Sequence, residues 1–348
     1  MISELKRFYN SAKIFRFFIY HLYIYKSIFR DLLEKYFFKP PFIKPRNIVL
    51  KLSTRCNAHC KFCYAQNENK LGNPELTLEE WKEVIDQSRE LGCYTVTLSG
   101  GEPMIYPHLV ELVRYVRKKR MIPFTTTNGL AASRELLKEL DSAGLCALNF
   151  SIHGPREYHD ALVGVPGAFD RNIENGEFCA RHTRIVAVVN HVLTNESVRN
   201  GWYEELRKMA KAKGFRAFNI LPVCVSSPDK SDLLGPQELD VLDRLAKDPE
   251  VLMDTKNYST PHCPAAREDL LVNNYGDVQP CPFIPISFGN VHTSSIKDLF
   301  LRIQNHPMFE KQRTVCMPAR DHQFIDDYIT PAFKNDRLPA PIEDIWSE

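Results

Sequence analysis

Short apolar runs alternate with helical patterns through the middle of this 348-residue chain, and this alternation restricts the fold more than any other feature. Neighbouring parallel strands need long crossover connections, and a right-handed series of such connections curls into a barrel. The alternation therefore predicts six strand-helix units, with strands at NIVLKLS (47–53), YTVTLSG (94–100), PFTTT (123–127), CALNFSI (146–152), RIVAVVNHVL (184–193) and RAFNILP (216–222).

Helical periodicity fills the segments between these strands. The expected helices span 77–91, 109–119, 133–143, 170–182 and 198–213, and TLEE at the start of the first is typical of a capping box. Six units are fewer than a closed TIM barrel contains. We therefore expect an α/β fold, a partial (β/α)6 TIM-like barrel open on one side, with its active groups at the carboxyl ends of the strands.

Three cysteines follow the first strand directly, in STRCNAHCKFC at positions Cys56, Cys60 and Cys63. Thiolates are the usual ligands of iron–sulfur clusters, and three ligands on a four-iron cluster leave one iron open to a substrate or cofactor. A zinc site that uses His59 as a fourth ligand is the first alternative. Three unconnected thiols are the second.

The CxxxCxxC loop resembles the signature of the radical S-adenosylmethionine (SAM) superfamily, in which an aromatic residue, here Phe62, precedes the last cysteine. The resemblance covers about residues 47–222. It implies that the open iron chelates the amino and carboxylate groups of SAM, with the aromatic residue near the adenine. It also implies that the reduced cluster splits SAM into methionine and a 5′-deoxyadenosyl radical, which abstracts a hydrogen atom from the substrate.

A second motif of that family, GGEP, follows the second strand at residues 100–103. Glycines there let the backbone approach a ligand closely, and a carboxylate can accept hydrogen bonds from the methionine ammonium. The resemblance also extends to TTTNG after the third strand and to the serine of NFSIHG after the fourth. The expected cofactor-binding residues are Phe62, Gly100, Gly101, Glu102, Pro103, Asn128, Ser151 and Asn190.

No catalytic residue is assigned by these motifs. His153 stands where many members of the family carry aspartate, so a role for its side chain does not follow from the resemblance. His153, His159 and Asp160 are either catalytic or order the loop by hydrogen bonds. Cys93, Cys146 and Cys179 lie on strand or helix faces and are expected in the core.

The C-terminal part has a different pattern, in which two apolar runs flank a turn at 274–277 and predict a β-hairpin. Cys263 precedes the hairpin and Cys281 ends it, and a serine-capped helix from Ser294 or Ser295 leads the chain back toward Cys316. This arrangement resembles the SPASM/Twitch extension of radical SAM enzymes, although full SPASM domains contain more cysteines.

The resemblance implies one auxiliary [4Fe-4S] cluster, with Cys263, Cys281 and Cys316 as ligands. Its fourth ligand stays open among Cys224, His262, Asp321, His322 and a substrate atom. The alternative is that these three cysteines are buried structural thiols.

The N-terminal segment, residues 1–46, has ten Lys or Arg residues against three Asp or Glu, and it holds thirteen of the aromatic residues. Its apolar residues share one face of a helix, and the longest uncharged run, 17–25, is too short to span a bilayer. The helix either lies on a membrane surface or docks on the barrel or at a dimer contact. We expect four regions: this extension (1–46), the barrel (47–225), a linker or helical connection (226–260) and the auxiliary-cluster domain with its tail (261–348).

A radical SAM enzyme acting on a peptide or natural product, with oxidation, rearrangement or cross-linking as the outcome, is the leading expectation. The first alternative is radical chemistry on a membrane lipid or polyprenyl-linked molecule, and the second is a non-catalytic iron–sulfur electron carrier. Expected partners are the substrate and a reductant such as flavodoxin or ferredoxin. Nucleic acid is not expected, because the excess of basic residues is confined to the N-terminus. The absence of a secretory signal and the metal-like cysteine spacings favour a reducing cytoplasm, with or without peripheral contact with the membrane.

Overall fold

The computed structural model describes residues 44–67, 74–248, 250–253, 263–311 and 313–346. The amphipathic helix expected within 1–46 lies almost wholly outside the described residues and stays a prediction.

One large sheet forms the centre of the described part of the chain, with nine strands in the order β7-β6-β5-β4-β3-β2-β1-β8-β9. The six predicted strands occur in chain order and pair in parallel, which confirms the partial barrel. The bounds are β1 (Asn47–Lys51), β2 (Thr95–Ser99), β3 (Ile122–Thr127), β4 (Ala147–Ser151), β5 (Val186–Leu193), β6 (Ala217–Pro222), β7 (Val251–Met253), β8 (Asp269–Val272) and β9 (Val278–Gln279).

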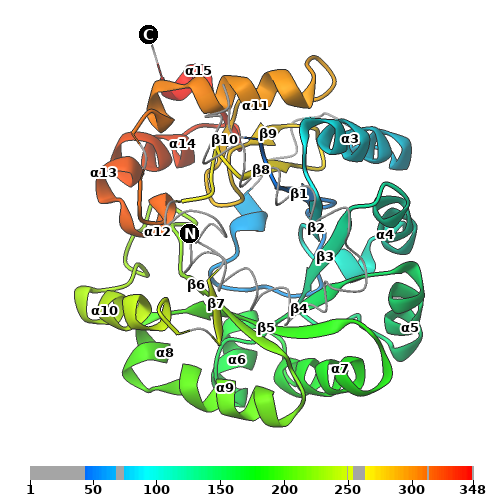
Figure 1. Ribbon diagram of the computed structural model, residues 1–348. Helices are drawn as coiled ribbons and strands as arrows, with labels where there is room; N and C mark the ends of the chain where they lie inside the picture. Colours follow the sequence, from blue (N-terminus) through cyan, green and yellow to red (C-terminus); the bar gives the residue numbers. More distant parts are fainter. Residues whose placement is uncertain (1–43, 68–73, 249, 254–262, 312, 347–348) are drawn as a thin grey trace, which may run out of the picture.

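Helices cover the outer face of this sheet, and Figure 1 shows them as a ring around the strands. Thr77 and Glu80 form the predicted capping box of the first helix, and Ser133 caps the third. The helices of the barrel are α3 (Leu78–Leu91), α4 (Leu109–Lys118), α5 (Arg134–Ala143), α6 (Arg156–Val163), α7 (Ala168–His182), α8 (Asn195–Arg199), α9 (Trp202–Ala212) and α10 (Pro236–Leu245).

The expected pattern of the barrel differs from the structure at two helices. The helix α6 was not expected, and the single helix expected over 198–213 was wrong. The structure has two helices there, α8 and α9, separated at Gly201. The backbone of Gly201 is left-handed, with φ of 68°. A left-handed residue cannot continue a right-handed helix, so the chain turns and starts again.

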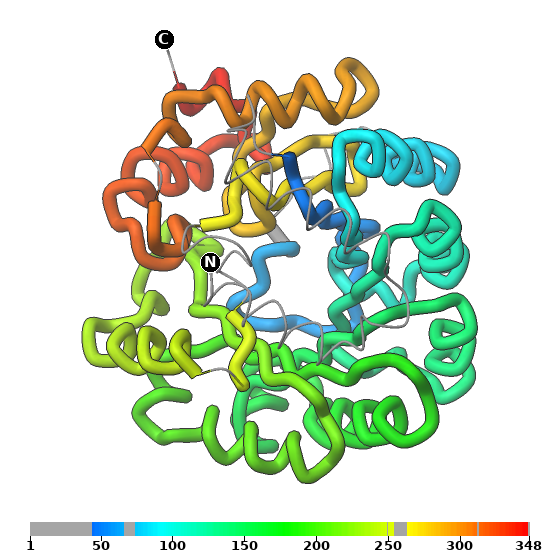
Figure 2. The backbone as a smooth tube through the Cα atoms, viewed as in Figure 1, coloured from blue at the N-terminus to red at the C-terminus, as the bar shows by residue number. Residues whose placement is uncertain are grey.

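The C-terminal hairpin is present as predicted, because β8 and β9 pair antiparallel. In addition, β8 pairs in parallel with β1, with Ile48 opposite Leu270. The hairpin therefore extends the barrel sheet at the edge where the sequence pattern left it open. Figure 2 shows the hairpin segment beside the first strand.

The remaining C-terminal elements continue the ring of helices. The helix α11 (Ile296–Asn305) is capped by Ser295 as predicted and packs on α3, where Gln87 accepts the backbone N–H of Ile296 at 3.0 Å. After it come α12 (Met317–Arg320), α13 (His322–Phe324), a π-helical turn (Ile325–Ile329), α14 (Thr330–Phe333) and α15 (Ile342–Ile345), with a small pair of strands, β10 (Ile286–Ser287) and β11 (Ala340–Pro341).

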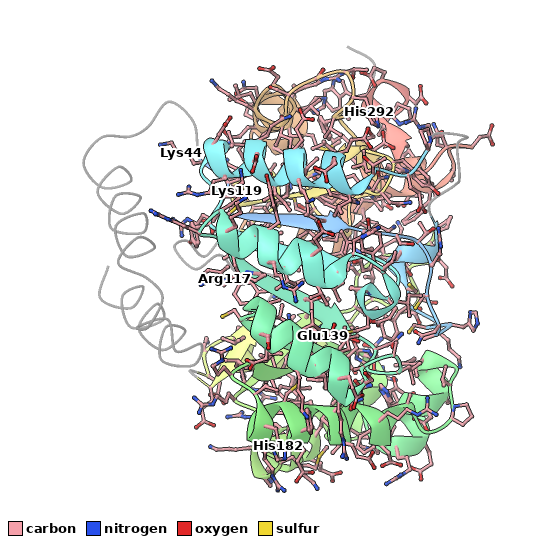
Figure 3. All side chains as sticks on the ribbon, turned by 90° about the vertical axis from the view of Figure 1, so that its right-hand side faces the viewer. Lys44, Arg117, Lys119, Glu139, His182 and His292 are labelled. Atoms are coloured by element: carbon pink, nitrogen blue, oxygen red, sulfur yellow. The ribbon has the colours of Figure 1, made fainter. Side chains whose placement is uncertain are left out.

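The two ends of the barrel carry different groups, basic side chains at one end and the cysteine loop at the other. Lys44, Arg117 and Lys119 lie together at the end where β1 begins (Figure 3). The cysteine loop leaves β1 at the opposite end. Within the described ranges, none of the helices combines the length and the apolar character needed to cross a membrane.

Candidate functional site

The CxxxCxxC loop lies at the carboxyl end of β1, where a barrel fold places its active groups. Two backbone hydrogen bonds hold it against the end of α6: His59 N–H donates to Val163 O at 3.0 Å, and Lys61 N–H donates to Leu162 O at 3.1 Å. A short 3₁₀ turn, Tyr64–Asn67, follows the last cysteine. The loop is therefore attached to the barrel at both sides of its central thiol.

The three thiols of this loop lie close enough to influence one another. Burial, followed by the negative charges of Cys63 and Cys56, raises the pKa of Cys60 to about 12. Burial also raises the pKa of Cys56. Three negatively charged thiolates would repel one another in this loop unless a cation compensated their charge. A four-iron cluster would do so, with one thiolate on each of three irons.

A single metal ion fits this loop less well. Ligands of one zinc ion all lie about 2.3 Å or less from it. A structural zinc site takes four such ligands, and the loop supplies three thiols. His59, the fourth zinc ligand considered above, is exposed. The donor set of the loop therefore fits a four-iron cluster with an open iron better than it fits zinc.

The two glycines of the GGEP turn pack against the start of the cysteine loop. A Cβ atom on Gly101 would lie 2.0 Å from the carbonyl oxygen of Arg55, and one on Gly100 would lie 2.6 Å from that of Ser53. Gly101 N–H also donates to Ser53 O at 2.7 Å. The sequence predicts that these glycines let the backbone approach a ligand closely. In the structure, they let it approach the backbone segment that leads into Cys56.

Glu102 is a buried acceptor that joins the loops after β2 and β3. Its Oε1 accepts the backbone N–H of Met104 at 2.9 Å and the hydroxyl of Thr127 at 2.8 Å, and its Oε2 accepts the backbone N–H of Asn128 at 2.7 Å. Burial outweighs these hydrogen bonds and raises the pKa of Glu102 to about 7. A carboxylate has about four acceptor positions, so roughly one remains for a ligand. Pro103 is buried and begins the 3₁₀ turn Pro103–Ile105.

Asn128 reaches from the end of β3 to the cysteine loop. Its Nδ2 donates to the Sγ of Cys56 at 3.6 Å and to Oδ1 of Asn57 at 2.8 Å. The hydrogen bond to sulfur lowers the pKa of Cys56 and so opposes the effect of burial. The structure thus brings Asn128, a predicted site residue, into direct contact with two residues of the loop that lie 71 and 72 positions away in sequence.

Ser151 and Asn190 lie in one row across the sheet, because they are register partners on β4 and β5. The row continues to Asn219 on β6, whose Nδ2 donates to Oδ1 of Asn190 at 2.7 Å. Sequence reasoning missed Asn219. Its signal is a polar residue at an alternate position of an otherwise apolar strand.

Phe62 is partly exposed and packs against a buried histidine. Its ring meets that of His153 edge to face, with centroids 4.9 Å apart. Nδ1 of His153 accepts the backbone N–H of Val192, and Nδ1 of His159 accepts that of His153, both at 3.2 Å. Burial lowers the pKa of His159 to about 4, so the ring is neutral near pH 7. The oxygens of Asp160 accept backbone N–H groups at the start of α7. These contacts order the segment that follows β4.

Lys51 is a second residue that the sequence reasoning missed. It is the last residue of β1, only 1% exposed, and its Nζ donates to Ala65 O at 3.2 Å. The same Nζ lies 5.8 Å from the ring centroid of Tyr64. A lysine inside a strand that is otherwise apolar, immediately before the cysteine motif, was the available signal.

The C-terminal cysteines form a second group. Burial, followed by the charge of Cys316, raises the pKa of Cys263 to about 12. Burial, followed by the charges of Cys263 and Cys316, raises the pKa of Cys281 well above its ordinary range. The three thiols proposed as auxiliary ligands are therefore neighbours, although they are far apart in sequence.

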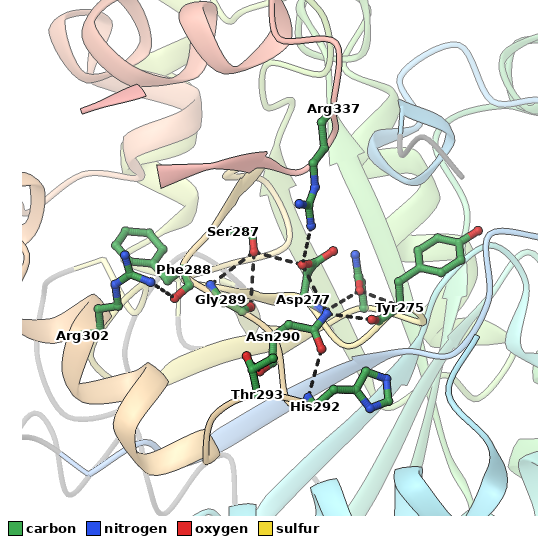
Figure 4. A network of polar contacts seen from close by, with 11 residues as sticks. Tyr275, Asp277, Ser287, Phe288, Gly289, Asn290, His292, Thr293, Arg302 and Arg337 are labelled. Carbon is green, nitrogen blue, oxygen red and sulfur yellow. Dashed lines mark hydrogen bonds and ion pairs between the residues drawn. The ribbon is translucent and has the colours of Figure 1, made fainter. Parts of the chain in front are cut away.

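A polar network supports the hairpin that carries this second group (Figure 4). Asp277 is 1% exposed, and its Oδ1 accepts from Ser287 Oγ at 3.2 Å and from Arg337 Nη2 at 3.0 Å. Asn290 Nδ2 donates to Tyr275 O at 2.8 Å. Arg337 belongs to the C-terminal tail, so the tail is tied to the turn of the hairpin.

A small cavity, about 20 Å³ in volume, lies between the two cysteine groups. Tyr64, next to Cys63, forms one wall, and Pro282 and Phe283, next to Cys281, form another. The rings of Tyr64 and Phe283 meet with centroids 5.1 Å apart. The remaining lining residues are Val225, Gln279, Pro285, Phe333 and Leu338.

Two family models match the chain. The radical SAM superfamily model matches residues 50–200, which include the cysteine loop and the GGEP turn. The model of the iron–sulfur cluster-binding SPASM domain matches residues 263–323, which include the three C-terminal cysteines. Together these domains imply a SAM-binding [4Fe-4S] cluster and auxiliary iron–sulfur ligation.

Individual proteins agree with the two family matches. The chain is 28% identical over 305 residues to the AdoMet-dependent heme synthase of Methanosarcina barkeri, covering 77% of this chain and 85% of that protein. It is 31% identical over 155 residues to the PqqA peptide cyclase of Bradyrhizobium diazoefficiens, covering 44% and 40%.

The fold is also that of solved structures. It resembles SuiB of Streptococcus suis bound to S-adenosylmethionine with a TM-score of 0.62 and 16% identity, over 82% of this chain and 68% of that one. The fold, the cysteine loop and the two family matches agree: the chain contains a radical SAM domain within residues 50–200 and a C-terminal SPASM domain within residues 263–323.

Proposed function

We propose that the chain binds SAM at the Cys56–Cys60–Cys63 loop and uses it to remove a hydrogen atom from a peptide or a related natural product. The observation that carries this proposal is the grouping of three thiols at the carboxyl end of β1, fixed by the GGEP turn and by Asn128. When bound, the reduced cluster supplies the electron that splits SAM into methionine and a 5′-deoxyadenosyl radical.

The chain's own residues position the reactants and limit the access of water. Glu102 keeps about one acceptor position for the methionine ammonium, while its other hydrogen bonds hold the third loop. Asn128 stabilises the thiolate of Cys56 through its N–H group. Phe62 forms an apolar wall beside His153, where the adenine of SAM is expected. Ser151 and Asn190 offer polar groups in the row across β4 and β5.

A peptide is the preferred substrate class in this proposal. A protein that is 31% identical over part of the chain is named PqqA peptide cyclase. In the same proposal, a protein such as flavodoxin or ferredoxin donates the electron that reduces the first cluster.

An iron tetrapyrrole is the second candidate substrate. It is favoured by a different observation, since the relative that matches over 77% of this chain is named a heme synthase. A lipid substrate depends on residues 1–46, which lie almost wholly outside the described residues. Vesicle co-sedimentation with and without residues 1–40 tests that alternative.

The central experiment measures release of 5′-deoxyadenosine after anaerobic cluster assembly, with dithionite or reduced flavodoxin as the electron donor. We expect release from the unaltered chain and none from Cys56→Ala, whose first cluster lacks a ligand. Cys93→Ala is the matched control, because Cys93 is a buried core thiol on the same barrel. No release from the unaltered chain would instead favour an electron carrier.

The substrate class is tested by stimulation of the same reaction. Precursor peptides encoded beside the gene and Fe-coproporphyrin III are compared at equal concentration. Transfer of deuterium from a labelled peptide into 5′-deoxyadenosine supports the peptide proposal. Stimulation by the tetrapyrrole alone contradicts it.

A further inference from the structure

The second cysteine group has a fourth thiol close by, contributed by the barrel rather than by the SPASM domain. Cys224 lies two residues beyond the end of β6 and is 8% exposed. It packs in a small apolar group with Cys316 and Ala319, and Phe283 covers this group. That group is separate from the main core of the described residues.

Backbone contacts fix Cys224 in this place. Val225 N–H donates to Pro318 O at 3.0 Å, which ties the segment after β6 to the first turn of α12, next to Cys316. Phe283 N–H donates to the Sγ of Cys281 at 3.3 Å, so the residue that covers Cys224 also contacts a second thiol of the group. Cys224 therefore shares neighbours with two of the three proposed auxiliary ligands.

The other side chains considered as a fourth ligand are less well placed. Asp321 is occupied, because it pairs with Arg313 Nε at 2.6 Å and accepts the N–H of Phe324 at 3.0 Å. His322 is exposed. His262 lies outside the described residues. Cys224 is the buried candidate of the right chemistry, since thiolates are the usual ligands of iron–sulfur clusters.

We propose that Cys224 is the fourth protein ligand of the auxiliary cluster, together with Cys263, Cys281 and Cys316. This inference rests on the proposed function and on the auxiliary iron–sulfur ligation that the SPASM match implies for the last three thiols. It adds that each iron of the auxiliary cluster carries a protein thiolate, so none is open to a substrate atom. The open iron of the first cysteine group is then the only iron that a ligand other than protein can bind.

The test uses the full chain with Cys56, Cys60 and Cys63 replaced by alanine, so that only the auxiliary cluster assembles. After anaerobic reconstitution we expect about four iron and four sulfide per chain. The electron paramagnetic resonance (EPR) spectrum of the reduced protein should not change when cyanide is added, because cyanide needs an open iron. A cyanide-induced change in this protein overturns the inference.

Two variants in the same background complete the test. Cys224→Ala should either retain a cluster whose EPR spectrum shifts on addition of cyanide, or fail to retain the cluster. Cys179→Ala is the matched control, because Cys179 is a buried thiol of α7 in the main core, and it should behave as the background protein does. A Cys224→Ala spectrum identical to the background, with or without cyanide, contradicts the proposal.

Misfolding is separated from loss of a ligand by a third variant, Cys224→Ser. Serine has a similar size and can bind iron through oxygen, so we expect a retained cluster with an altered spectrum. The cyanide measurement on the background protein needs no substitution at Cys224 and decides the question if both variants unfold. Complete absence of iron in the background protein would contradict an auxiliary cluster at the last three thiols, whereas an iron open to cyanide would contradict only the assignment of Cys224. The proposed function fails separately, if the unaltered chain releases no 5′-deoxyadenosine.

Discussion

The carboxylate of Glu102 accepts the backbone N–H of Asn128 at 2.7 Å, so one buried side chain joins the loops that follow β2 and β3. Asn128 in turn donates to the Sγ of Cys56, in the loop that follows β1. Three neighbouring strand ends are thus connected through two residues. The geometry of the first cysteine group depends on both of them.

Replacing Glu102 should change the pH dependence of stability. Because burial raises the pKa of Glu102 from 4.5 to about 7, the folded chain holds this proton where the unfolded chain has released it. The contribution of Glu102 to the free energy of unfolding is therefore full below about pH 4.5 and falls as the pH rises through 7. The difference between the unaltered chain and Glu102→Gln, from urea denaturation without cluster, should decline across that window.

The matched control for this experiment is Glu79→Gln, because Glu79 is an exposed carboxylate on α3. As a substitution of an exposed side chain, it should change the free energy of unfolding by less than about 0.5 kcal/mol. At neutral pH, Glu102→Gln should destabilise the fold by about 1–3 kcal/mol. The amide NH₂ of glutamine would face N–H and O–H groups that are themselves donors, so these groups would lose an acceptor. A flat difference curve for Glu102→Gln would show that the carboxyl group titrates normally.

Gly101→Ala should displace the start of the cysteine loop. The added methyl group would meet the carbonyl of Arg55 at 2.0 Å, and backbone atoms cannot move aside easily. We expect a loss of about 1–3 kcal/mol in the free energy of unfolding, as for other overpacked sites, and reduced iron binding. Gly235→Ala is the control, because its methyl group would meet side-chain atoms of Glu238 and Asn195 rather than backbone. Equal effects of the two substitutions would contradict the close packing of the loop.

Asn128→Ala should make the thiol of Cys56 harder to ionise. The hydrogen bond from Asn128 lowers the pKa of Cys56, so its loss should raise that pKa. Alkylation of Cys56 at pH 7.5 in the metal-free chain should slow by about 2- to 10-fold, which corresponds to a hydrogen bond of ~0.5–1.5 kcal/mol. The control is Asn175→Ala, which removes a hydrogen bond to Gly129 O in the same region but no contact with sulfur. Mass spectrometry of the alkylated peptide gives the rates, and identical rates would exclude the predicted contact.

Arg337→Ala should destabilise the hairpin that carries Cys281. Asp277 is buried, but the side chain of Arg337 is 36% exposed, so solvent screens the pair and we expect a loss of only about 1 kcal/mol. Adding Asp277→Asn to this variant should recover part of the loss, because a neutral amide needs no cation. Arg184→Ala, which breaks a surface pair with Asp141, serves as the control and should change stability by less than about 0.5 kcal/mol. No recovery in the double variant would show that charge is not the cause.

Local sequence signals were sufficient for much of this fold. Strand periodicity, the capping box at Thr77 and the serine cap at Ser295 depend on residues within a few positions of one another. The hairpin also has a local origin, because its strands are joined by a short turn. Only at Gly201 did periodicity mislead, since a helical pattern continued across a residue that adopts a left-handed conformation.

The sequence by itself determined the order of most strands and helices, the cysteine loop after the first strand and the radical SAM and SPASM motifs, because each of these depends on residues that are close together in the chain. Tertiary structure alone decided that β8 pairs with β1, that Asn128 meets Cys56 and that Cys224 meets Cys316. These contacts join positions far apart in the chain. They exist only because curvature of the sheet brings distant strand ends to one place, and no local pattern encodes that curvature.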